Sequence, residues 1–128
     1  MRIRSSQSNV RRFAQPQKKY IEAKGEYDLR KSQFDRLRQP LDHALDQGTI
    51  SDEEWAQKVT ALEFECGIPD AQSKLNEAEH ELVEWARQKL DPHMTEKQRA
   101  EIAIVWEKWL LPNVRDKVID LCMRLEDV

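Results

Sequence analysis

The sequence predicts an all-α protein, and three observations carry that prediction. Large side chains recur every seven residues near the start of the chain, at Phe13, Tyr20, Tyr27, Phe34 and Leu41. Glycine occurs only three times in 128 residues, and no stretch alternates apolar and polar residues as a strand does. Because seven residues are close to two helical turns, the five side chains follow one line along a helix. We therefore expect a bundle of four to five helices.

Size and composition suit one domain with a thin core. The chain has a mass of 15.2 kDa, within the range of a single domain. Hydrophobic residues make up 39% of it and charged residues 35%; the first share is low and the second is high for a globular domain. We expect a single helical domain over residues 13–128, preceded by a flexible basic arm at residues 1–12.

The line of large residues belongs to a long first helix, expected over residues 16–38 and, after a kink, to about residue 47. Pro16 suits the first helical position. Gln39 precedes Pro40 and is pushed away from helical geometry, but apolar residues continue the line past the proline. We define as the aromatic seam, and predict to pack against a partner helix, the residues Phe13, Tyr20, Tyr27, Phe34, Leu37 and Leu41.

Two further helices follow from capping residues and apolar spacing. Ser51 with Glu54 three residues later forms a capping box, so a helix is expected over residues 51–66, ended by Gly67. The next helix, over residues 69–90, begins at a proline. Its apolar face is nearly a heptad seam, formed by Ile68, Ala71, Leu75, Ala78, Leu82 and Trp85.

A second capping box, Thr95 with Gln98, opens a helix expected over residues 95–111. Apolar residues lie on nearly all of its sides, and a helix of that kind is predicted to be buried. The last helix is expected over residues 113–126, after Pro112. The predicted anchors of this part of the core are Trp106 and Trp109, packed against Leu110, Val118 and Leu121.

Charge divides the chain into a basic beginning and an acidic remainder. Residues 1–38 carry eleven basic and four acidic side chains, a net charge of +7, whereas residues 39–128 carry a net charge of −10. Either the first helix packs on an acidic helix of the same chain, or the basic end binds a polyanion such as nucleic acid. The candidate contacts for a polyanion are Arg2, Arg4, Arg11, Arg12, Lys18 and Lys19.

No motif for catalysis, metal binding or nucleotide binding stands out. Glu77 and His80 have the spacing of a di-iron ligand pair, but no second such pair accompanies them. The stretch Gly48–Trp55 resembles the second half of an EF-hand loop, although the preceding ligand positions lack carboxylates. It is also similar to the helix-start element of small bacterial oligomerisation modules of the SHOCT type. Cys66 and Cys122 form no metal or disulfide motif.

These observations favour a non-enzymatic helical protein, a small assembly subunit or adaptor that acts through a helix-packing face. We expect no cofactor, no small-molecule substrate and no membrane contact, and a cytoplasmic, soluble protein. The expected partner is a second copy of the chain or another helical protein. The alternative is a nucleic-acid-associated accessory protein that contacts phosphates through its basic N-terminal arm.

Overall fold

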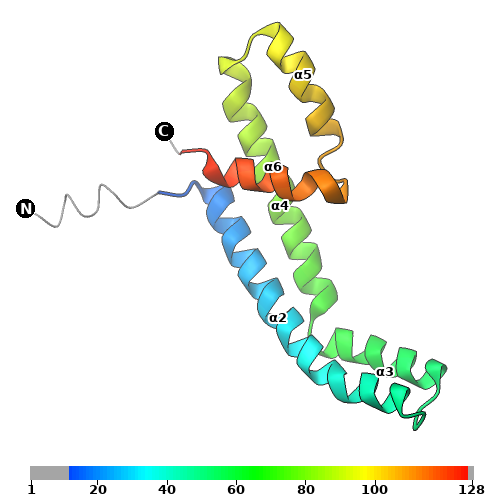
Figure 1. The fold of residues 1–128 in the computed structure, drawn as a ribbon. Coiled ribbons are helices and arrows are strands. Elements are labelled where there is room, and N and C mark those ends of the chain that lie inside the picture. Colours follow the sequence, from blue (N-terminus) through cyan, green and yellow to red (C-terminus); the bar gives the residue numbers. More distant parts are fainter. Residues whose placement is uncertain (1–11, 127–128) are drawn as a thin grey trace, which may run out of the picture. The chain divides into compact units, whose positions relative to one another are not determined.

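The computed structural model of the chain describes residues 12–126. Over this range the protein is all-helical and contains no strand, which confirms the predicted fold class. The helices are α2 (Gln15–Asp46), α3 (Asp52–Glu65), α4 (Ile68–Leu90), α5 (Glu96–Glu107) and α6 (Pro112–Arg124), with a 3₁₀ turn η1 (Asp91–His93) after α4 (Figure 1). Most of the predicted arm, residues 1–11, lies outside the described range.

The chain divides into two compact units. Unit 1 combines the start of the chain, up to Tyr20, with everything from Ala78 onward. Unit 2 is the continuous segment Ile21–Glu77. The long helices α2 and α4 therefore each contribute residues to both units. The prediction of a single domain over residues 13–128 stays a prediction.

In unit 2, α3 folds back on the second half of α2 (Figure 1). Its small core consists of Phe34, Val59 and Cys66, and Leu41 and Trp55 are among the partly buried residues that cover it. Phe34 is only 2% exposed, because the side chains of α3 close over it. One residue of the aromatic seam is thus the centre of this core.

The helix α2 passes through Pro40 without ending there. A proline removes one backbone hydrogen bond from a helix, so the turns beyond it need other contacts. Leu41 packs on the unit 2 core, and Asp42 accepts a 2.8 Å hydrogen bond from the indole N–H of Trp55. These contacts on α3 hold the last turns of α2 in place as far as Asp46.

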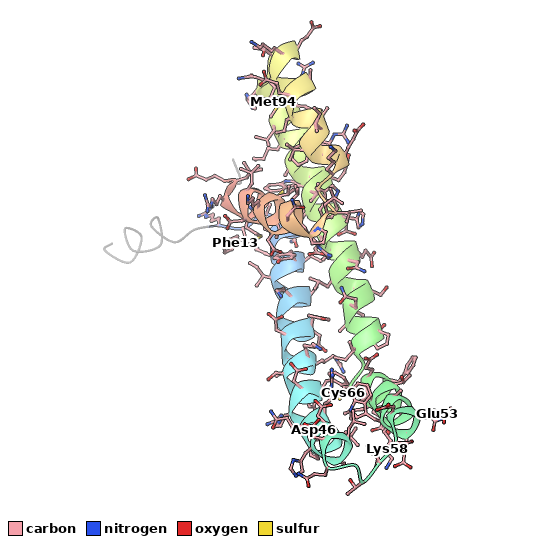
Figure 2. All side chains as sticks on the ribbon, turned by 45° about the vertical axis from the view of Figure 1, so that its right-hand side comes forward. Phe13, Asp46, Glu53, Lys58, Cys66 and Met94 are labelled. Atoms are coloured by element: carbon pink, nitrogen blue, oxygen red, sulfur yellow. The ribbon has the colours of Figure 1, made fainter. Side chains whose placement is uncertain are left out.

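Gly67 makes the sharp connection from α3 to α4. Its φ is +71°, a conformation that residues with a Cβ adopt at a cost. A Cβ at this position would also lie 2.6 Å from an Nη1 atom of Arg30, and that guanidinium donates a hydrogen bond to the carbonyl of Cys66. The glycine thus lets α2 cap the end of α3, at the junction marked by Cys66 in Figure 2.

In unit 1, α6 crosses α4, and α5 returns alongside the second half of α4 (Figure 1). The shared core lies where these helices meet, and Tyr20 of α2 packs against its edge. The buried members are Leu82, Val83, Ala86, Trp106, Trp109, Val118, Ile119 and Cys122. The predicted apolar face of α4 is confirmed, since Ala71, Leu75, Ala78 and Leu82 are all buried; of these four, Leu82 belongs to the unit 1 core.

Candidate interaction surface

A buried glutamine ties the two ends of unit 1 together. Gln17 is fully buried, and its Oε1 accepts a 2.8 Å hydrogen bond from the backbone N–H of Ala14. Its Nε2 donates to the carbonyl of Cys122 at 2.9 Å and to that of Leu125 at 2.8 Å. Cys122 lies in the last turn of α6 and Leu125 is the residue that caps its end, positions at which carbonyls have no partner within the helix. One side chain therefore caps α6 and anchors the start of α2.

An ion pair joins α4 to α6 in the same unit. Glu79 is 6% exposed, and both of its carboxylate oxygens accept hydrogen bonds from the guanidinium of Arg115, with Nε at 3.1 Å from Oε2. The paired, two-point geometry compensates for removing the carboxylate from water. No sequence motif pointed to Gln17, Glu79 or Arg115, because each is a polar residue whose partners lie far away along the chain.

The two tryptophans predicted as anchors are Trp106, on the inner side of α5, and Trp109, in the turn that follows it. The helix ends at Glu107, four residues before the expected end at residue 111. Trp106 is 8% exposed and Trp109 is 7% exposed, and both belong to the unit 1 core together with Val118. The ring of Trp109 also meets the imidazole of His80 edge to face, with centroids 5.0 Å apart. This part of the prediction is confirmed.

The outer side of α5 is exposed, and the prediction that this helix is buried all round is wrong. Ile104 is 57% exposed and Leu110 is 53% exposed; Val105 and Leu111 are exposed as well. Two residues turn a helix by about 200°, so burying Trp106 against α4 and α6 directs Ile104 away from them. Leu110 and Leu121 are likewise exposed rather than packed on the tryptophans. We use the name α5 outer face for the exposed apolar residues of this helix and of the turn that follows it, which are Ala100, Ile104 and Val105 on the helix and Leu110 and Leu111 beyond its end at Glu107.

A shallow groove borders the α5 outer face on one side. It encloses about 560 Å³ and begins near Met94, labelled in Figure 2 at the turn between η1 and α5. Its walls are mostly apolar, with His93, Gln98 and Glu101 at the rim. The lining residues are Leu90, His93, Met94, Gln98, Glu101, Ile102 and Val105. Together with the outer face, the groove gives unit 1 an uncovered apolar surface.

The aromatic seam is largely covered inside the chain. Besides the buried Phe34, Phe13, Tyr20, Tyr27 and Leu41 are half-buried, each within its own unit. Leu37, at 47%, is the most exposed residue of the seam. The seam supplies core contacts in both units, and its role as an interface with a partner helix stays a prediction.

The candidate polyanion contacts fall mostly at the edge of the described range. Arg2, Arg4 and Arg11 lie outside it, whereas Arg12, Lys18 and Lys19 are exposed. The Nζ of Lys19 lies 2.9 Å from a carboxylate oxygen of Glu81 on α4. This ion pair is consistent with one explanation of the charge asymmetry, that the basic first helix packs on an acidic helix of the same chain.

Groups that could support catalysis are sparse in the described part of the chain. No cluster of three or more His, Cys, Asp or Glu side chains is arranged to hold a metal ion between residues 12 and 126. Cys66 and Cys122 are both buried free thiols. Burial raises the pKa of Cys122 to about 11, which keeps the thiol neutral and unreactive. Among the helices described, none is long and apolar enough to cross a membrane.

Comparison with family models, characterised proteins and solved structures gives no match to this chain.

Proposed function

We propose that this chain is a non-enzymatic helical binding protein, an assembly subunit or adaptor, that packs the α5 outer face against a helix of another chain. The observation that supports the proposal is that α5 and the turn after it carry more apolar side chains than the described chain covers. The sequence places apolar residues on nearly every side of the segment 102–111, but within residues 12–126 the chain covers only the side that carries Trp106 and, in the following turn, Trp109. An apolar surface left uncovered in this way is typical of a site for protein association.

Covering this surface contributes favourable free energy to binding through burial of apolar side chains. Burying a large aliphatic side chain completely stabilises by about 1.5–3 kcal/mol. Ile104, Val105, Leu110 and Leu111 are each between about a third and a half exposed or somewhat more, so completing their burial contributes about 1 kcal/mol apiece. A partner that covers all four gains a few kcal/mol from the outer face before any polar contact is counted.

A photo-crosslinking residue at position 104 tests the proposal. The variant is produced in cells and illuminated, and the adducts are resolved by mass. The matched control carries the same residue at position 116, an exposed site on α6 outside the α5 outer face. We expect an adduct of one defined mass from position 104 and none from position 116. Equal, diffuse labelling from both positions, or no adduct from either, would contradict a binding role for this face.

A further inference from the structure

We propose that the partner is a second copy of this chain, and that the two α5 helices pack antiparallel about a twofold axis at the level of residue 102. This inference rests on the proposed function, since it names the partner for the part of the α5 outer face that contains Ala100 and Ile104. Three steps support it: a stripe of exposed residues on α5, the charges at the two ends of that stripe, and the sizes of the side chains between them.

The stripe has the spacing of a coiled-coil seam. Lys97, Ala100, Ile104 and Glu107 are separated by three, four and three residues, and all four are exposed. Residues with this spacing lie on one side of a helix and are the positions that meet a partner helix in a coiled coil. The buried tryptophan Trp106 lies on the opposite side, so the stripe is accessible while the core of unit 1 remains intact.

The charges favour an antiparallel pair over a parallel one. In a parallel pair each residue of the stripe meets its own copy, which places two lysines together at one end and two glutamates at the other. In the antiparallel pair, Lys97 lies opposite Glu107 of the partner subunit, and Glu107 lies opposite Lys97 of the partner subunit. Two complementary contacts thus replace two repulsive ones. Within the described residues, neither charge belongs to an ion pair.

The side chains between the charges are complementary in size. The same register places the small Ala100 opposite the larger Ile104 of the partner subunit, twice, so the helices can approach closely at the axis. The two Glu101 side chains come near each other at the edge of the contact, where both remain exposed and salt screens their repulsion. The apolar centre pairs Ile with Ala on both sides of the axis.

The size of the contact sets the expected affinity. A helix of twelve residues is about 18 Å long at 1.5 Å per residue, shorter than a standard protein interface requires. We therefore expect a reversible dimer with a dissociation constant on the order of 10–100 μM. Such a dimer forms and dissociates within the concentration range of sedimentation experiments.

Charge reversal provides the test, using the full chain. In Lys97→Glu both stripe charges become negative, and in Glu107→Lys both become positive, so neither variant should pair with itself. Mixed in equal amounts, the two variants should form a one-to-one heterodimer, because every negative position then lies opposite a positive one. Acidic residues suit the first turn of a helix and basic residues suit its end, so both substitutions are compatible with α5 itself.

Sedimentation equilibrium measures the outcome, and circular dichroism confirms that each variant is folded. We expect the wild-type chain to dimerise, each single variant to self-associate at least tenfold more weakly, and the mixture to recover the wild-type affinity. Lys117→Glu, at an exposed site on α6, is the matched control and should dimerise as the wild type does. Ile104→Ala, which keeps every charge, should also weaken the dimer.

Three results would overturn the inference. The first is a wild-type chain that stays monomeric up to about 500 μM, well above the expected dissociation constant. The second is a single charge variant that dimerises as well as the wild type. The third is a mixture of the two variants that fails to associate, which would exclude the antiparallel register. If the photo-crosslinker at position 104 then yields an adduct with a different protein, the proposed function stands and only the identity of the partner is wrong.

Discussion

Removing the guanidinium that faces Glu79 should destabilise unit 1 more than any single surface change. The substitution Arg115→Met keeps most of the aliphatic stem but leaves a carboxylate that is only 6% exposed without its partner. Breaking a buried ion pair from one side costs about 3–5 kcal/mol. Because the Arg115 side chain is 31% exposed, water screens part of the interaction, and we expect a loss of about 2–3 kcal/mol.

The double variant Glu79→Leu with Arg115→Met distinguishes the cost of an unpaired charge from a loss of packing. Replacing both members of a buried pair by apolar residues is often close to neutral, so the double variant should lie within about 1 kcal/mol of the wild type. Urea unfolding followed by tryptophan fluorescence measures these differences, since Trp85, Trp106 and Trp109 all belong to unit 1. The reasoning is refuted if Arg115→Met unfolds within about 0.5 kcal/mol of the wild type, or if the double variant is as unstable as Arg115→Met alone.

The remaining predictions concern three other parts of the chain. Gly67→Ala should destabilise the protein by about 1–2 kcal/mol in urea unfolding, because the residue has a positive φ and because a Cβ there displaces the Arg30 guanidinium from the carbonyl of Cys66. Gly48→Ala, which has a similar φ but open space around it, should cost less. Equal losses would show that the hydrogen bond from Arg30 contributes nothing. The hydrogen bond from Trp55 lowers the pKa of Asp42 below its usual value. The ionised Asp42 carboxylate therefore stabilises the fold above the pKa that it has in the unfolded chain, and this stabilisation is lost as the pH falls through the lower pKa of the folded state. In a chain whose other three tryptophans are replaced by Phe, the fluorescence of Trp55 should therefore change in that acidic range. Adding Asp42→Asn should abolish the change. A transition that persists after Asp42→Asn would belong to another group. If the basic arm binds nucleic acid, deleting residues 1–12 should weaken binding uniformly across sequences and flatten its salt dependence; a full-length chain that shifts neither DNA nor RNA at low salt removes that alternative.

Most helix starts and stops were predictable because they depend on local chemistry; the end of α5 at Glu107, rather than at the expected residue 111, is an exception. Thr95 and Gln98 form the reciprocal capping box expected from their spacing, and the hydroxyl of Ser51 accepts from the N–H of Glu54. Gly67 has the positive φ expected of a glycine that ends a helix. Each of these features needs only residues within one or two turns, so a single sequence contains all the information.

Features that depend on distant partners were not predictable in the same way. The continuation of α2 past Pro40 to Asp46 was expected from the apolar residues beyond the proline, but the residues of α3 that pack against those turns could not be read from the sequence. The apolar pattern of α5 showed that the helix needs cover without showing how much of it the chain itself supplies. The exposure of Ile104 and its neighbours, on which the proposed interaction surface rests, could therefore be seen only in the structure.

The sequence order of the two units has a consequence for synthesis on the ribosome. Unit 2 is continuous, so every residue of its core is available once Glu77 has left the exit tunnel. Unit 1 is discontinuous in sequence. The side chain of Gln17 can form its hydrogen bonds with the carbonyls of Cys122 and Leu125 only after these residues, more than a hundred positions later, have been synthesised. Domains generally fold in the order in which they emerge, so the middle of this chain can fold first while its beginning is held open. Until α6 has left the exit tunnel, Trp106 and Trp109 lack the side chains of Val118, Ile119 and Cys122 that pack with them in the unit 1 core, so this core is completed only after unit 2 can already fold.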